Sequence, residues 1–155
     1  MAHGKVAETI PAPAREVFDL VHDYSRRLEW DTLLSAAYLD DGYAEAEKGA
    51  TSVCVGKWYL GSIALKTVYV TFDRPAVAAV KMVNRPPFFD SWAASLRHED
   101  TKDGASDIVY TFHFTARPRY LRFVLDPLMG LVFTSEVRKR LRALKRHFGR
   151  NVDSN

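Results

Sequence analysis

The sequence predicts an α+β domain in which an antiparallel sheet packs against one long C-terminal helix. Two observations support this prediction. Between residues 128 and 148, apolar side chains return every three or four residues, which is the spacing of one helical face. Between residues 35 and 117 the apolar pattern has a period of two, and short turns containing Gly or Pro interrupt it.

Length and composition are those of an ordinary globular protein. The chain has 155 residues, of which 47% are hydrophobic and 26% charged. We expect one domain over residues 1–150 and a disordered tail over residues 151–155. There is no apolar run of about 18 residues and no apolar signal segment at the N-terminus. Cys54 stands alone, which excludes an internal disulfide. We therefore expect a cytoplasmic protein without stable membrane insertion.

The N-terminal segment predicts one strand and two small helices. Residues 5–10 alternate as a short strand does, and Pro11-Ala12-Pro13 ends it. Pro13 is well placed to begin a helix. One face of that helix is apolar and His22 lies off it, while a second short helix over residues 25–34 contains Trp30. The apolar face comprises Val17, Leu20, Val21 and Tyr24, with Phe18 at its edge.

Six strand-like segments follow, joined by connections of hairpin length, and an antiparallel meander is the arrangement we expect. The alternation indicates which side chains face the helix, and in residues 76–84 the opposite choice would bury Lys81. The segments are residues 37–41, 51–60, 62–73, 76–84, 88–100 and 106–117. The side chains expected to face inward are Val68, Val70, Phe72, Ala78, Val80, Met82, Asn84, Phe88, Trp92, Ala94, Leu96, Ile108, Tyr110, Phe112 and Phe114.

The long helix has an apolar stripe and a basic side. Asp126-Pro127 reads either as a cap followed by the first helical residue or as a kink within a longer helix, and Gly149 stands where a C-terminal cap is expected. The stripe contains Leu128, Met129, Val132, Phe133, Val137, Leu141, Leu144 and Phe148. The opposite side carries Arg138, Lys139, Arg140, Arg142, Lys145 and Arg146.

The basic side raises the question of an anionic partner. The net charge is +3, and the excess lies mostly in this helix. No aromatic residue interleaves the basic ones between Arg138 and Arg146, so a platform for stacking bases is missing. We interpret these residues as a solvated face whose charges oppose the helix dipole, and we expect no nucleic-acid partner.

In the order of its elements the chain resembles the helix-grip superfamily (START/Bet v 1-like, SRPBCC), and within it the bacterial polyketide cyclase/dehydrase-like or lipid-transport-like members. Residues 10–13 followed by Glu16-Val17-Phe18 are similar to the family's first strand-to-helix junction. Residues 72–75 resemble its strand-ending turn, and Leu128-Met129 with Leu141, Leu144 and Lys145 resembles its terminal helix. The resemblance implies a curved sheet of about seven strands wrapped around the helix, with a cavity between them.

The resemblance further implies that the cavity binds a hydrophobic small molecule, such as a lipid, isoprenoid or polyketide. The aromatic inner face agrees with this, although the same residues would also fill an ordinary core. We expect Asn84, Arg85 and Asp90 to form a polar mouth beside Pro86-Pro87. The candidate ligand-binding residues are Trp30, Phe72, Met82, Asn84, Asp90, Trp92, Tyr110, Phe112, Leu128, Val132 and Phe133. We expect a monomer or a weak homodimer.

Catalysis is left open by the sequence. We find no nucleophile elbow, glycine-rich phosphate loop or metal-binding motif, and we expect no metal and no cofactor. Cys54 is interpreted as an inert buried thiol. His98 shares the inward parity of Trp92 and is a candidate base, while His22 and the other histidines are assigned to outward or terminal positions. Asp90 either points into the cavity or is solvated. The alternative to a carrier is a cofactor-independent polyketide cyclase, aromatase or dehydratase.

Overall fold

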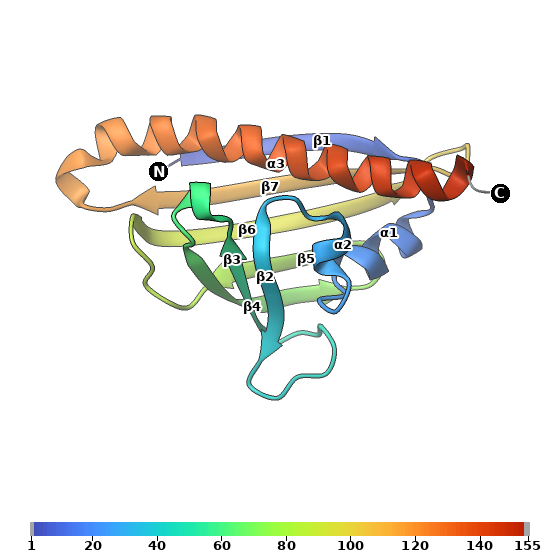
Figure 1. Cartoon of the computed structure of the whole chain (residues 1–155), viewed down its shortest axis with the longest axis horizontal. Coiled ribbons are helices and arrows are strands. Elements are labelled where there is room, and N and C mark those ends of the chain that lie inside the picture. The colour runs from blue at the N-terminus through green and yellow to red at the C-terminus, as the bar shows by residue number, and fades with distance from the viewer. Residues whose placement is uncertain (1, 154–155) are drawn as a thin grey trace.

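A curved, open, antiparallel sheet of seven strands holds a long helix along one edge (Figure 1), as predicted. The computed structural model describes residues 2–153, and the side chains of residues 2–150. The spatial order of the strands is β1-β7-β6-β5-β4-β3-β2. The strands are β1 (Ala2–Ile10), β2 (Leu34–Asp40), β3 (Thr51–Gly56), β4 (Ala64–Asp73), β5 (Val77–Met82), β6 (Phe89–Asp100) and β7 (Ser106–Ala116). The helices are α1 (Ala14–Val21), α2 (Arg27–Trp30), α3 (Arg122–Asp153) and the single turns η1 (Trp58–Leu60) and η2 (Arg119–Leu121).

Helix α3 packs against β1 and β7 and leaves the strands from β5 to β2 further away (Figure 1). Val137, Leu141 and Leu144 are fully buried in this contact, which confirms that part of the predicted stripe. Close approach at the start of β1 requires Gly4, because a Cβ there would lie 2.4 Å from the Phe112 ring. The main hydrophobic core therefore lies at the β1–β7–β6 side of the sheet.

A second, smaller core cluster lies where α1 covers the far end of the sheet. Phe18, Ala50, Tyr69 and Ala78 form it, and Phe72 packs against them. The prediction that Val68 and Val70 face inward was wrong. A bulge between Tyr69 and Thr71 changes which side chains of β4 point to the helix side of the sheet. Tyr69 and Phe72 consequently share one face, while Val70 is exposed.

A similar shift occurs at the start of β6. Phe88 was expected to face inward, but its φ of +70° places it in a left-handed turn before the strand, and its side chain is 55% exposed. The buried residue is Phe89. A register shift between Phe89 and Ser91 then brings Trp92 to the same face and leaves Asp90 exposed.

Helix α3 differs from the prediction at both ends. Pro127 lies inside the helix, which starts at Arg122. The structure therefore confirms the alternative in which Asp126-Pro127 belongs to a longer helix. The buried Asp126 carboxylate accepts the Ala116 N–H at 2.8 Å and ties this turn to β7. Gly149 does not end the helix, which continues to Asp153, and Ser154 and Asn155 of the expected tail lie outside the described residues.

Two other elements are shorter than predicted. The helix expected over residues 25–34 is the single turn α2, because β2 already begins at Leu34. The strand expected over residues 51–60 ends at Gly56 and passes into η1, which closes at Gly61 with a φ of +75°. Leu60 at the end of η1 and Ile63 after it line a cavity.

Candidate ligand-binding site

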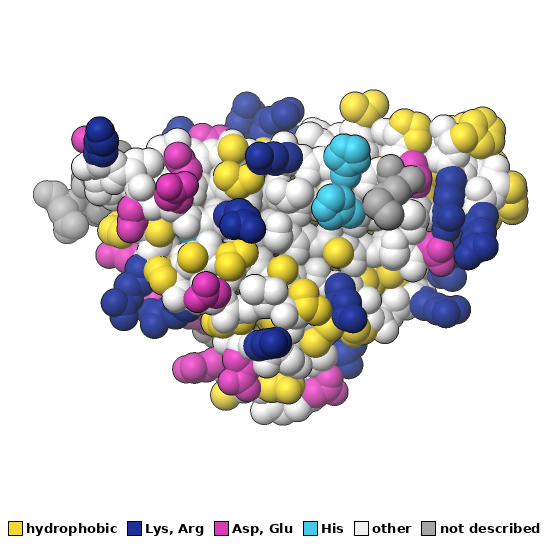
Figure 2. Space-filling view, turned by 180° about the vertical axis from the view of Figure 1, so that it is seen from behind, with side chains coloured by type: hydrophobic (Ala, Val, Ile, Leu, Met, Phe, Trp, Pro, Cys, Tyr) yellow, Lys and Arg dark blue, Asp and Glu magenta, His cyan; other side chains and the backbone are white. Residues whose placement is uncertain are grey.

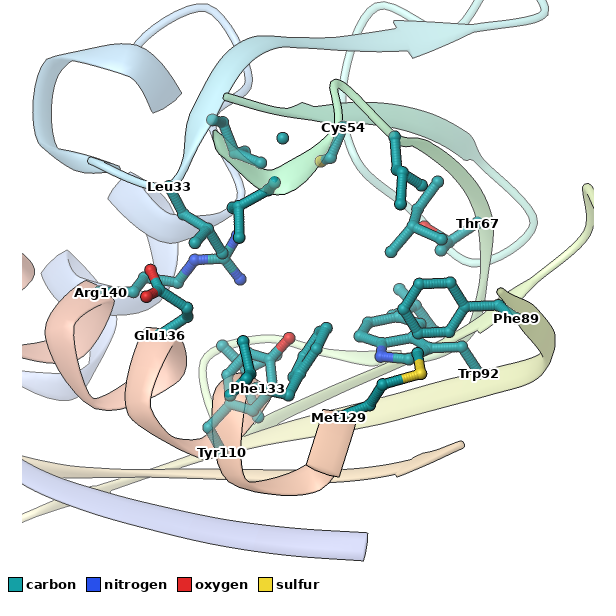
Figure 3. Close-up of a pocket in the computed structure, with 18 of the residues that line it drawn as sticks. Leu33, Cys54, Thr67, Phe89, Trp92, Tyr110, Met129, Phe133, Glu136 and Arg140 are labelled. Carbon is teal, nitrogen blue, oxygen red and sulfur yellow. The ribbon is translucent and has the colours of Figure 1, made fainter. Parts of the chain in front are cut away.

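A cavity of about 370 Å³ lies between α3 and the concave face of the sheet. Apolar side chains from β6 and α3 form one end of it, which we call the apolar end: Phe89, Trp92, Met129 and Phe133 (Figure 3). Leu65 on β4 continues this wall. The Trp92 indole N–H is buried and has no hydrogen-bond partner among the described residues. The apolar end therefore offers a large apolar surface with a single unpartnered donor, the Trp92 N–H.

The cavity opens to the surface beside α3. Leu128 and Val132 line it although they are 55% and 49% exposed, and Phe88 lines it from the loop before β6. These three residues form the mouth. Leu128 and Val132 were predicted to line the cavity, and they do; they are exposed because this part of the apolar stripe faces an open cavity and not a neighbouring strand.

A buried ion cluster forms the other end of the cavity, which we call the polar end. Asp31 accepts the Nε–H of Arg27 at 2.9 Å and the Nε–H of Arg140 at 3.2 Å. The Leu33 N–H donates to the same carboxylate at 3.1 Å, and Arg27 Nη1 donates to the Val21 carbonyl at 3.0 Å. Both arginines line the cavity and each is 7% exposed. The assignment of Arg140 to the solvated side of α3 was wrong.

The charges of this cluster stabilise one another. Burial alone would raise the pKa of Asp31, but Arg140 and Arg27 together outweigh it and hold that pKa below its ordinary value. Glu136 and Tyr110 also line the cavity here (Figure 3). The Glu136 carboxylate binds the Lys139 ammonium at 3.0 Å. Burial raises the pKa of Tyr110, although Arg140 and Arg27 act on it in the opposite direction.

A chain of three polar side chains crosses the cavity wall between α1 and β4. The Tyr24 and Tyr69 hydroxyls are 3.0 Å apart, and the Tyr69 hydroxyl is 2.7 Å from Nδ1 of His22. Burial, followed by Arg27 and His98, holds the pKa of His22 well below its ordinary value, so its ring is neutral near pH 7. In the tautomer that carries its proton on Nε2, the neutral ring accepts a hydrogen bond from the Tyr69 hydroxyl at Nδ1. The outward assignment of His22 was wrong.

Five of the sequence-predicted residues line the cavity: Trp92, Tyr110, Leu128, Val132 and Phe133. Phe112 does not, because it is fully buried beneath Phe133 with ring centroids 5.0 Å apart. Trp30 lies behind the wall, where the Arg27 guanidinium covers its ring at 5.0 Å. Phe72 is withheld from the cavity by its packing on Phe18 and Tyr69.

The predicted polar mouth lies elsewhere. Asp90 is exposed and pairs with Arg122, so the solvated alternative for this carboxylate is the one observed. Asn84 binds backbone groups of β4 through both side-chain atoms, at 3.0 and 2.8 Å. With Met82 and Arg85 these residues line a separate surface groove. The β6 register shift is the cause, because it turns Asp90 away from the face that carries Trp92.

The residues missed by sequence reasoning are mainly the polar ones. Arg27 and Asp31 have the i, i+4 spacing of a helical ion pair. Arg140 stands three residues after Val137 and four before Leu144, which is a position of the apolar stripe. Each signal is weak alone. Cys54, which lines the cavity and is half-buried, has a pKa raised by burial.

The surface carries apolar side chains at one end. Hydrophobic side chains gather where β7 passes into α3 (upper right in Figure 2), and the most exposed of that region are Tyr120, Phe123 and Leu131. Within residues 2–153 no helix is long and apolar enough to cross a membrane. The described part of the chain also contains no group of three His, Cys, Asp or Glu side chains placed to hold a metal ion.

Comparisons with known proteins agree with this architecture. The model of a family described as polyketide cyclase / dehydrase and lipid transport matches residues 1–149. A START superfamily protein from Mycobacterium smegmatis superposes with a TM-score of 0.81 at 9% identity, covering 97% of this chain and 99% of the other. The ZhuI aromatase/cyclase from a Streptomyces species gives 0.81 at 15% identity, covering 97% and 94%.

A third structure, a protein from Thermobifida fusca, has a TM-score of 0.73 at 24% identity and covers 97% of this chain and 95% of its own. At these identities the structures show a shared fold. None of the curated proteins compared with the chain matches it.

Proposed function

We propose that this chain, which belongs to the polyketide cyclase / dehydrase and lipid transport family, binds and carries a hydrophobic small molecule in the cavity beneath α3. The observation that supports this most directly is the open cavity of about 370 Å³ whose apolar end consists of Phe89, Trp92, Met129 and Phe133. Pockets of roughly 300–1,000 Å³ hold most of a drug-sized ligand. A lipid, isoprenoid or polyketide has the matching size and polarity.

The affinity should increase with the length of the ligand's apolar chain until the chain fills the cavity. Burial of one CH₂ group contributes about 0.8 kcal/mol, which corresponds to a change of roughly fourfold in Kd. A series of linear alcohols measured by titration calorimetry should therefore show Kd falling by about that factor for each added carbon, and then levelling off. Native mass spectrometry of protein purified from its own host identifies the natural ligand class.

Blocking the mouth provides the matched test. Val132→Trp places a large ring at the mouth, whereas Leu131→Trp places the same ring at a neighbouring position that is 73% exposed and outside the cavity lining. The first variant should weaken binding of dodecanol and the second should not. Equal affinities in both variants, or a series without dependence on chain length, would show that the ligand does not occupy this cavity.

A second candidate function is the dehydration or cyclisation of a polyketone, and one observation favours it. The chain from Tyr24 through Tyr69 to the neutral His22 could accept a proton from the carbon next to a carbonyl. In a dehydration, the electron pair of the broken C–H bond forms the C=C bond as the C–O bond of the β-hydroxyl breaks, and the proton held by His22 returns through the two tyrosines to the hydroxyl, which leaves as water. Tyr69→Phe should abolish turnover of a β-hydroxy ketone and leave its binding intact, and an unchanged rate would exclude this role.

A further inference from the structure

The polar end of the cavity has more positive charge than its own residues neutralise. Two buried cations, Arg27 and Arg140, share the single buried carboxylate of Asp31, while the Glu136 carboxylate is paired with Lys139. The Lys139 side chain is 63% exposed and water screens it, whereas the Arg27 and Arg140 side chains are only 9% and 8% exposed. A buried cation without a full counter-charge is costly, so an anion in the cavity would be stabilised here.

Arg27 and Arg140 also have hydrogen-bond donors that are not used within the protein. Each guanidinium has five N–H groups. Arg140 uses its Nε–H on Asp31, and its two terminal nitrogens have no hydrogen-bond partner among the described residues. Arg27 uses Nε and Nη1, which leaves its Nη2 without one. Asp31 does not satisfy them, since it accepts the two Nε–H groups and the Leu33 N–H.

A neutral donor stands beside these cations. Tyr110 is 4% exposed, lines the cavity, and its hydroxyl has no hydrogen-bond partner in the described part of the chain. Figure 3 shows Tyr110 beneath the cavity on the side of Arg140 and Glu136, opposite Phe89 and Trp92. An acceptor bound at this end therefore meets a planar cationic fork and a hydroxyl, while its apolar body extends toward Trp92.

We propose that the ligand carries a carboxylate, which binds the terminal nitrogens of Arg140 and the hydroxyl of Tyr110 at the polar end of the cavity. This inference rests on the proposed function and adds the chemical class of the ligand. Planar guanidinium groups bind carboxylates in a fork-like geometry. The apolar body can belong to a fatty acid or to a polycyclic aromatic acid, and both share the carboxylate that the site recognises.

Matched pairs of ligands test the proposal. We would measure Kd by titration calorimetry for dodecanoate against dodecanol, and for anthracene carboxylate against anthracene methanol. A hydrogen bond to a charged group predicts that the acid binds about 10- to 100-fold more tightly than its alcohol. A preference in one pair identifies the source of the carboxylate. Equal affinities within both pairs overturn the inference but leave the proposed function, whereas binding of none of the four overturns both.

Variants assign the preference to this end of the cavity. Arg140→Gln should reduce the preference for acid over alcohol about tenfold or more, while Asp31 stays paired with Arg27. Arg142→Gln, on the exposed side of the same helix, is the matched control and should leave it unchanged. Glu136→Gln removes a negative charge from the polar end and should increase the preference. A preference that survives in Arg140→Gln overturns the inference.

A measurement on the wild-type protein covers the case in which Arg140→Gln does not fold. The Arg140 Nε–H signal in a nitrogen-15 NMR spectrum should shift on addition of dodecanoate and stay in place on addition of dodecanol. Tyr110→Phe, which preserves the ring, should weaken dodecanoate binding by about 2- to 10-fold, the range of a single neutral hydrogen bond. An Arg140 signal that responds equally to both ligands contradicts carboxylate recognition.

Discussion

Mild acid should destabilise this protein through His98, which lies buried on β6. Both of its ring nitrogens are without a hydrogen-bond partner among the described residues, and its ring packs edge-on against Phe18 at 5.3 Å. Burial lowers the pKa of His98 from 6.5 to about 4. The unfolded chain therefore binds a proton between these two values that the folded chain does not bind, and stability falls as the pH falls from 6.5 toward 4.

The magnitude follows from the difference between the two pKa values. At about 1.36 kcal/mol for each pKa unit, the loss over the whole window is about 3 kcal/mol, of which about 1 kcal/mol falls between pH 6 and pH 5. His22 contributes in the same direction, because burial, Arg27 and His98 lower its pKa as well. Most carboxylates titrate below about pH 5, so this interval isolates the histidines.

Urea unfolding at pH 7, 6 and 5 measures the effect. His98→Phe replaces an unpaired polar ring with an apolar one, so its free energy of unfolding should fall about 1 kcal/mol less than that of the wild type between pH 6 and pH 5. His113→Phe, at an exposed position of β7, controls for the substitution itself. If His98→Phe and the wild type lose the same stability over this interval, the argument from burial is refuted.

Two further substitutions test the packing and the buried charges by urea unfolding. Asp31→Asn leaves Arg27 and Arg140 without their shared counter-charge and should cost about 3–5 kcal/mol, and a loss below about 1 kcal/mol would show that water reaches the cluster freely. Leu141→Ala, at a position that is 1% exposed, should cost about 2–5 kcal/mol, whereas the exposed Arg142→Gln should stay within about 0.5 kcal/mol. Similar values for these two would mean that the helix is rotated.

The fold was predictable because its periodicities are long and regular. Alternation in β7 buries Ile108, Tyr110, Phe112 and Phe114 as predicted, and the choice that kept Lys81 exposed gave the correct face of β5. Parity failed where an extra residue enters a strand, in β4 before Thr71 and in β6 before Ser91. A bulge depends on the neighbouring strand as well as on local sequence, so a period of two cannot reveal it.

The apolar part of the candidate site was accessible to the same reasoning, and the polar part was not. Trp92 and Phe133 were identified by the spacing of apolar residues. This spacing is the same whether the side chains line a cavity or fill a core. The pairing of Arg140 with Asp31 joins residues 109 positions apart, and nothing local in either segment indicates it. Charged residues are almost never buried unless paired, so the sequence alone assigned Arg140 to the surface, and only the position of Asp31 in the fold explains its burial.

One half of the sheet forms most of the core and the other half forms cavity walls, and this affects how the protein can change over evolution. Most of the fully buried side chains belong to α1, β1, β6, β7 and α3, whereas β3, β4 and η1 contribute walls to the cavity and few residues to that core. Substitutions at Leu60, Ile63 or Leu65 can therefore reshape the space available to a ligand while the packing of α3 on β1 and β7 stays intact. A lineage with this architecture can acquire a new ligand without first acquiring extra stability.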